Sequence, residues 1–141
     1  MIIFPRNLPQ PINSISLKDS FPLGVDLVEL ETAKSLYRSH SRRLKTLFSR
    51  EEISYIQKDK KPHERLAILL AAKEAVFKAL APAWMGVSGF QDIQISPQSR
   101  QRLAVRLKGS FRRPVKKQNH LEISLLKKNR NYVVVGCRGV V

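Results

Sequence analysis

One long segment, residues 62–81 (PHERLAILLAAKEAVFKALA), constrains the fold more than any other part of the chain. Its Leu and Ala residues favour a helix, Pro62 suits the first turn of a helix, and Pro82 would end it. At about 100° per residue, the large apolar side chains gather on one face, formed by Leu66, Leu69, Leu70, Phe77 and Leu80. Such a face must be buried against another layer, so the sequence predicts a long helix packed against the rest of the protein.

Three charged residues lie in the second half of this helix. Glu74 and Lys78 share a neighbouring face, and the small residues Ala67 and Ala71 beside them would leave room for a ligand. The simpler interpretation is a surface pair at positions i and i+4, which contributes about 0.2–0.5 kcal/mol. Lys73 falls within the apolar face, where a lysine must either reach outward or meet an anion.

A further acid, Asp26, lies in residues 24–30 (GVDLVEL), a segment apolar enough to predict a buried strand. A buried carboxylate is unfavourable unless a cation or hydrogen-bond donors compensate it. Taken alone, Asp26 could instead face solvent or cap a turn. Mg²⁺ is commonly held by one or two carboxylates together with water and phosphate oxygens. Asp26 and Glu74 therefore predict a magnesium site, with Lys73 and Lys78 as counter-charges for phosphate.

The remaining pattern predicts an α+β domain. From residue 30 to about 47 the apolar spacing is helical, and Ser49 with Glu52 forms a capping box that opens a second helix reaching about residue 58. Strands are predicted at 90–95, 103–108, 121–126 and 132–137, after a loop marked by Gly86 and Gly89. We expect an antiparallel sheet packed on the long helix.

The domain boundaries follow from length and proline content. A chain of 141 residues suits a single domain spanning 1–141. Residues 1–22 contain four prolines without a sustained period, which predicts an extended N-terminal arm with a short strand at 1–4.

The charge of +15, with 26 basic residues against 11 acidic ones, favours polyanionic partners. Nucleic acid, a phosphorylated cofactor, an acidic protein and an anionic membrane surface all satisfy this condition. No apolar run approaches the roughly 18–20 residues needed to cross a bilayer, so we expect no membrane span. The single cysteine, Cys137, excludes an internal disulfide and favours a cytoplasmic protein and a buried core position.

Four segments in order carry a resemblance to a known family. Residues 24–30 (GVDLVEL) resemble the Gly-x-Asp-Ile-Val-Glu-Ile strand of holo-acyl-carrier-protein synthases, and residues 72–80 (AKEAVFKAL) resemble the Lys-Glu-Ala/Ser-x-x-Lys helix of the wider 4'-phosphopantetheinyl transferase superfamily. Residues 48–52 (FSREE) and 90–95 (FQDIQI) are similar to the Leu-Ser/Thr-x-x-Glu turn and the Phe-x-Asp-Ile-x-Val strand of the synthases. The length resembles the short, single-copy type.

The resemblance implies an activity and a site. Such enzymes transfer the 4'-phosphopantetheine arm of coenzyme A to a serine of an apo acyl carrier protein and release 3',5'-ADP, a step of lipid and fatty acid biosynthesis. By analogy Asp26 and Glu74 would hold Mg²⁺, and Glu74 or a water beside it would take the serine proton. Lys78 would stabilise the leaving phosphate, and Lys73 would help to bind phosphate.

The resemblance also implies partners. Short synthases assemble as trimers, and their first helix docks an acidic carrier protein. Here that helix would present a basic side formed by Lys34, Arg38, Arg42 and Lys45. A solvated helix face without a partner is the alternative.

Some positions depart from the family pattern, and they concern the coenzyme A contacts more than the metal site. Basic residues of short synthases are replaced by Thr32 and Leu69, a Gly-Thr-Gly by residues 81–83 (APA), and a histidine by Lys127. Arg100, Arg102, Arg112 and Arg113 are candidates for the 3'-phosphate. Two other functions stay open at this point, a basic nucleic-acid-binding protein and a non-catalytic relative that binds a carrier protein. Sparse aromatic residues in the basic C-terminal half count against single-strand recognition.

Overall fold

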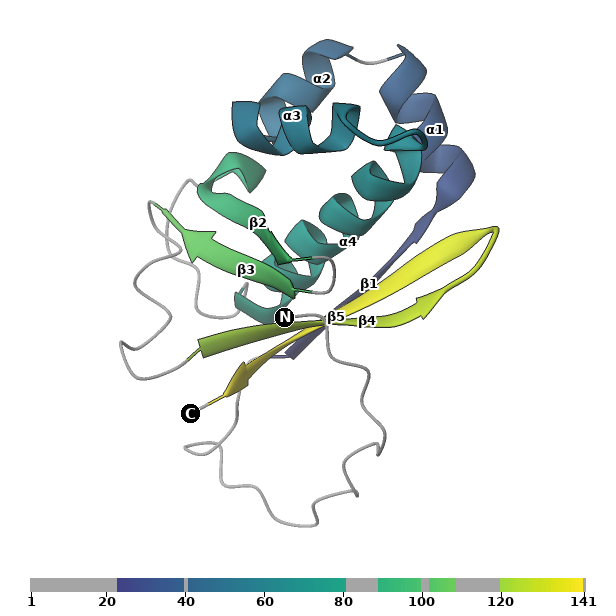
Figure 1. Ribbon diagram of the computed structural model, residues 1–141. Coiled ribbons are helices and arrows are strands. Elements are labelled where there is room, and N and C mark those ends of the chain that lie inside the picture. Colours follow the sequence, from purple (N-terminus) through teal and green to yellow (C-terminus); the bar gives the residue numbers. More distant parts are fainter. Residues whose placement is uncertain (1–22, 40, 81–88, 100–101, 109–119, 141) are drawn as a thin grey trace.

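The computed structural model of the protein describes residues 23–39, 41–80, 89–99, 102–108 and 120–140 (Figure 1). The expected arm over residues 1–22 and the loop around Gly86 lie outside the described residues. The elements in chain order are β1 (Leu23–Glu29), α1 (Leu30–Ser39), α2 (Ser41–Leu47), α3 (Arg50–Gln57), α4 (Pro62–Leu80), the 3-10 helix η3 (Phe90–Asp92), β2 (Ile93–Ser99), β3 (Arg102–Leu107), β4 (His120–Lys128) and β5 (Tyr132–Val140). This order of helices and antiparallel strands confirms the α+β class.

The described strands form two antiparallel sheets on a long helix. One sheet has three strands in the order β1-β5-β4, and the other is the β2-β3 hairpin. Helix α4 runs through the middle of the molecule, between the three-stranded sheet and the shorter helices α1, α2 and α3 (Figure 1). Residues of α4 adjoin both sheets and the short helices, so this helix fixes how the layers meet.

Helix α4 lies within one residue of its predicted bounds and is buried around most of its circumference. Ala67 and Ala71, expected to leave room for a ligand, are fully buried in the core. Their small size lets neighbouring protein approach the helix, so the room predicted beside Glu74 on this side is filled.

The predicted buried strand is present as β1, but it is buried on one face only. Gly24, Asp26 and Val28 point inward in strict alternation, whereas Leu23, Val25 and Leu27 on the other face are 68%, 44% and 51% exposed. Because side chains alternate across a strand, Asp26 is held on the same side as the core residues.

The prediction of one helix over residues 30–47 was wrong, because the structure has two helices, α1 and α2, on either side of His40. Ser39 and Ser41 flank the junction, and serine favours helix ends because its hydroxyl competes for backbone groups. Leu30, Ala33 and Leu44 still reach the core from both helices.

Other local predictions fared differently. The capping box of α3 is confirmed, since Ser49 Oγ accepts from Glu52 N at 3.2 Å and Glu52 Oε1 accepts from Ser49 N at 2.8 Å. The predicted strand at 90–95 begins instead with η3, and β2 starts at Ile93. Cys137 is a buried free thiol, as expected for a core residue. In the described part of the chain, no helix combines the length and apolar character needed to span a membrane.

Gly24 marks the closest approach of β1 to α4, and this contact yields a stability prediction. A Cβ atom at position 24 would lie 2.0 Å from Ala75 O and 2.6 Å from Ala79 N, which are backbone atoms that cannot rotate away. Gly24→Ala should therefore lower the free energy of unfolding by about 1–3 kcal/mol, measured by urea denaturation.

A matched control for this variant is Gly89→Ala. A Cβ atom at position 89 meets nothing within 4 Å, so this variant should unfold at the wild-type midpoint. Equal midpoints for both variants would contradict the close crossing of β1 and α4.

Candidate active site

The strand β1 presents Asp26 to helix α4. Asp26 is 8% exposed, which excludes the alternative that it faces solvent. Its Oδ1 atom lies 2.6 Å from Lys78 Nζ, and the same ammonium donates to Val25 O at 3.2 Å. Asp26 and Lys78, 52 positions apart, thus form an ion pair in which the ammonium compensates one of the two oxygens of the buried carboxylate.

Lys78 stands at the opening of this site. Its side chain is 55% exposed, although its ammonium contacts the buried Asp26. The hydrogen bond to Asp26 raises the pKa of Lys78 above its ordinary value, and burial opposes this effect. Lys78 therefore remains a cation that both solvent and an anionic ligand can reach.

Glu74 lies one helical turn before Lys78, beside the same carboxylate. Burial, followed by the contact with the Asp26 carboxyl group, raises the pKa of Glu74 to about 7, and Lys78 opposes this rise. Two acids at hydrogen-bonding range disfavour simultaneous ionisation, because their negative charges repel each other in a poorly solvated place. Asp26 and Glu74, predicted from separate segments, are therefore brought together by the fold.

One oxygen of Asp26 tests whether a cation fits between these carboxylates. Asp26 Oδ2 is buried and accepts no hydrogen bond from any donor in the described part of the chain. Glu74 can bond to Asp26 only through a proton, which it loses at a pH above its pKa of about 7. A buried acceptor without a donor, beside a second carboxylate, suits a divalent cation with oxygen preference such as Mg²⁺.

A metal here would take few protein ligands. Among the residues that the structure describes, no group of three or more His, Cys, Asp or Glu side chains could hold an ion together. Two carboxylates leave most of an octahedron to water and to oxygens of a bound phosphate, which is how Mg²⁺ is commonly held at phosphate sites.

A cavity of about 600 Å³ opens beside Glu74. Its walls are Glu31, Thr32, Ser35, Leu36, Arg43, Leu47, Leu70, Glu74 and Phe90. The sequence analysis did not select Arg43. It assumed one continuous helix, in which the residue spacing places Arg42 rather than Arg43 on the basic side with Lys34. The break between α1 and α2 changes that phase, and the serines around His40 were the available signal.

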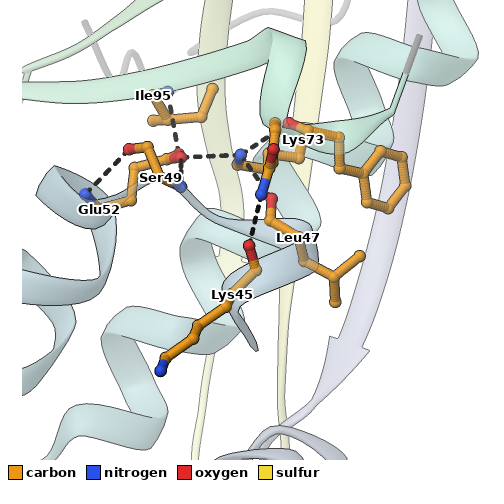
Figure 2. A network of polar contacts seen from close by, with 8 residues as sticks. Lys45, Leu47, Ser49, Glu52, Lys73 and Ile95 are labelled. Atoms are coloured by element: carbon orange, nitrogen blue, oxygen red, sulfur yellow. Dashed lines mark hydrogen bonds and ion pairs between the residues drawn. The ribbon is translucent and has the colours of Figure 1, made fainter. Parts of the chain in front are cut away.

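Lys73 lies apart from Asp26 and Glu74, which corrects the expectation that it helps to bind phosphate. The side chain is fully buried, and its Nζ lies 2.8 Å from Glu52 Oε1 (Figure 2). It also donates to Leu47 O at 2.8 Å and to Phe90 O at 2.7 Å. Of the two alternatives for Lys73, reaching outward or meeting an anion, the second is confirmed, and the anion is the Glu52 carboxylate.

The four cations expected to dock a carrier protein come from two helices. Lys34 and Arg38 lie on α1, and Arg42 and Lys45 lie on α2, so they do not share one continuous helix face. Arg38, Arg42 and Lys45 are exposed, and Lys34 is partly buried. The basic character of the surface remains, but its geometry differs from the prediction.

The departures from the family pattern have separate positions. Thr32 is exposed and lines the cavity beside Glu74, whereas Leu69 is fully buried in the core. Lys127 is exposed on β4, and its Nζ lies 5.6 Å from the centre of the Tyr132 ring. Residues 81–83 and Arg100, Arg112 and Arg113 lie outside the described residues, and Arg102 begins β3.

Comparison with known proteins decides the family. The model of the 4'-phosphopantetheinyl transferase superfamily matches residues 22–136. The chain belongs to this superfamily. The match covers β1, α4 and all the residues of the candidate site.

Similar proteins agree with this assignment. A holo-[acyl-carrier-protein] synthase of Clostridium kluyveri is 34% identical over 105 residues, which cover 74% of this chain and 78% of the relative. One from Caldicellulosiruptor saccharolyticus is 33% identical over 117 residues, covering 83% and 93%. Among solved structures, the ACPS–CoA complex of Chronobacterium ammoniagenes superposes with a TM-score of 0.69 at 25% identity, over 86% of this chain and 97% of that one.

The raised pKa of Glu74 predicts an unusual stability effect in metal-free protein. The native pKa of about 7 lies above the ordinary 4.5, so stability is lost as the pH rises through this range. Glu74→Gln binds no proton there, and its amide can donate to Asp26 Oδ2. In EDTA at pH 8.5 we expect the free energy of unfolding of this variant to exceed that of wild type by about 1–2 kcal/mol. Near pH 4.5 the two free energies of unfolding should be equal.

The measurement is urea denaturation at both pH values. Glu51→Gln, at an exposed carboxylate of the first turn of α3, is the control and should not gain stability at pH 8.5. A loss of stability in Glu74→Gln at pH 8.5 would show that the two carboxylates do not destabilise each other.

Proposed function

We propose that this protein transfers the 4'-phosphopantetheine arm of coenzyme A to a serine of an apo acyl carrier protein and releases 3',5'-ADP. The observation that carries this proposal is the buried pair Asp26 and Glu74 with Lys78 at its opening, in a chain of this superfamily. The retained acids and the reachable cation favour a catalyst over a relative that only binds its partner.

Asp26 and Glu74 are the residues that would hold Mg²⁺. The orphaned Asp26 Oδ2 and the raised pKa of Glu74 both support a cation between them. When bound, Mg²⁺ would supply positive charge to the pyrophosphate of coenzyme A.

The protein's own groups would orient the reaction and move its proton. Lys78, held by Asp26 and open to solvent, would stabilise negative charge on the leaving phosphate. Glu74, or a water held beside it, is placed to accept the proton of the carrier serine. The cavity beside Glu74 would receive the reacting groups, with Arg43 as an additional cation in its wall.

An acidic carrier protein is the expected macromolecular partner. Arg38, Arg42 and Lys45 are exposed on α1 and α2, near the cavity walls formed by the same helices. Long-range attraction between this basic surface and an acidic carrier would speed their encounter.

A homotrimer is the proposed assembly. The outer face of β1 exposes Leu23, Val25 and Leu27. Leu126 of β4 adds to the same face, since its side chain lies against Gly136, the β5 register partner of Val25. An apolar face of this kind on one sheet is a reasonable interface between copies of the chain. The cytoplasm is the proposed location, which suits the buried free thiol of Cys137.

Transfer itself is the first test. Incubation of the protein with coenzyme A, Mg²⁺ and apo carrier proteins should add one phosphopantetheine mass to the carrier serine, detected by intact-protein mass spectrometry. Asp26→Asn and Glu74→Gln should each reduce kcat/KM at least about 100-fold, because each removes charge at the site where the reaction is stabilised.

A control variant distinguishes the loss of a catalytic group from the general loss of one positive charge. Lys78→Met should lose activity, whereas Lys58→Met, at an exposed lysine of the charged turn after α3, should not. No mass gain on any carrier, or full activity of the Asp26→Asn and Glu74→Gln double variant, would reject the proposal. Steeply salt-dependent binding to nucleic acid, indifferent to Mg²⁺ and coenzyme A, would support the rival function instead.

The docking surface has its own prediction. The variant Arg38→Glu with Arg42→Glu should raise KM for an acidic carrier about tenfold and leave KM for coenzyme A unchanged, because repulsion affects the encounter with the carrier. Lys58→Glu with Lys61→Glu makes the same charge change on the turn before α4 and should have little effect. Equal effects of the two variants would indicate a general field rather than a docking surface.

A further inference from the structure

The buried cation Lys73 precedes Glu74 on α4 and has a full set of acceptors. An ammonium group has three protons to donate. Here they meet Glu52 Oε1, Leu47 O and Phe90 O at 2.8, 2.8 and 2.7 Å (Figure 2). Lys73 therefore ties α4 to the end of α2 and to the start of η3.

Glu52 extends this network to two further segments. Its Oε1 accepts from Ser49 N at 2.8 Å, at the beginning of α3, and its Oε2 accepts from Ile95 N of β2 at 3.2 Å (Figure 2). The carboxylate is 3% exposed. One buried ion pair thus joins α2, α3, α4, η3 and β2.

Two of these attachments are walls of the cavity beside Glu74. Leu47 and Phe90 both line that cavity, and their carbonyl groups are the two that Lys73 holds. Phe90 is fixed further by an edge-on contact with Phe77 of α4, with ring centres 5.7 Å apart. The distance of both walls from Glu74 therefore depends in part on Lys73, which does not itself line the cavity.

Stability alone gives little reason for an ion pair in this core. Moving two charges out of water is unfavourable, and apolar residues of similar volume often stabilise such a place as well or better. An apolar side chain has no directional bonds, however, and would remove the Lys73 donor from the carbonyls of Leu47 and Phe90, the second of which would keep its bond from Ile93 N. What the pair supplies beyond apolar packing is a set of directional bonds that hold these carbonyls to α4.

We propose that Lys73 and Glu52 are positioning residues of the transferase site, which set the width of the cavity beside Glu74 by holding Leu47 and Phe90 to helix α4. This inference rests on the proposed function. Neither side chain lines the cavity beside Glu74, and both are buried, so neither would touch a substrate there. Lys73 acts on substrate binding through the two walls, whereas Glu74, its neighbour, acts in the reaction.

The test separates positioning from folding through steady-state kinetics. Lys73→Met, Glu52→Gln and the double variant Glu52→Gln/Lys73→Met are compared with wild type for KM of coenzyme A and of carrier, and for kcat. A merely structural role would reduce the folded fraction, which lowers apparent kcat and leaves both KM values unchanged. Positioning predicts that at least one KM rises about tenfold while kcat per folded molecule stays within about threefold, because Asp26, Glu74 and Lys78 are intact.

A second readout needs neither metal nor turnover. In metal-free protein, hydrogen exchange of the backbone around residues 44–49 and 89–95 should be faster in the double variant, with exchange in β1 and β5 unchanged. The matched control is Glu64→Gln/Lys128→Met, which removes an exposed ion pair of 3.5 Å and should alter neither KM nor exchange. If Lys73→Met does not fold, Glu52→Gln, which keeps the volume and one acceptor oxygen, gives the same comparison.

The outcomes distinguish this proposal from the function on which it rests. Wild-type protein that modifies no carrier rejects the proposed function. Active wild type together with a folded double variant of unchanged KM and unchanged local exchange rejects only the positioning role. A raised KM, together with faster hydrogen exchange confined to residues 44–49 and 89–95, supports the positioning role.

Discussion

The close crossing of α4 over β1 is the contact on which the rest of the structure depends. Gly24 lets the helix backbone approach the strand to a distance that no larger residue would permit, at Ala75 and Ala79. Asp26 is two residues further along the same face of β1, and Lys78 lies on the facing helix. The approach that completes the core therefore also brings a strand carboxylate within hydrogen-bonding distance of a helix ammonium.

The same crossing creates an electrostatic conflict. Lys78 neutralises one oxygen of Asp26, but the other oxygen lies beside the Glu74 carboxyl group and receives no donor from the residues that the structure describes. A sequence selected for stability alone would place an amide or an apolar group at one of these positions. Such conflicts concentrate at functional sites, where a bound cation or substrate relieves them. The repulsion is thus evidence for a ligand, because Asp26 Oδ2 is the one buried side-chain oxygen or nitrogen of the described residues that has no hydrogen-bond partner.

Much of this arrangement could be predicted from the sequence, and the features that could not be predicted have physical explanations. The bounds of α4 and the capping box at Ser49 and Glu52 follow from patterns in short segments, whereas the meeting of Asp26 with α4 was predicted from the chemistry that two acids share and from the family resemblance. The break between α1 and α2 did not, because apolar spacing continues across His40 and a junction of a single residue hardly alters it. The exposed face of β1 was not predicted, because leucine and valine in a short strand are usually buried in the core of the same chain. The sequence alone does not distinguish that position from an exposed apolar face.

Lys73 shows why neighbouring residues in one motif need not share a task. Successive helix positions differ by about 100°, so Lys73 turns toward Glu52 while Glu74 turns toward Asp26. The motif alone places both charges on one short stretch and invites the interpretation that both meet the phosphate. Burial decides otherwise, because three protein acceptors satisfy the Lys73 ammonium and solvent reaches Lys78 instead. Helix α4 thus carries a fixed anchor on one side and the candidate site residue Glu74 on the next, so adjacent residues of one motif meet separate surroundings.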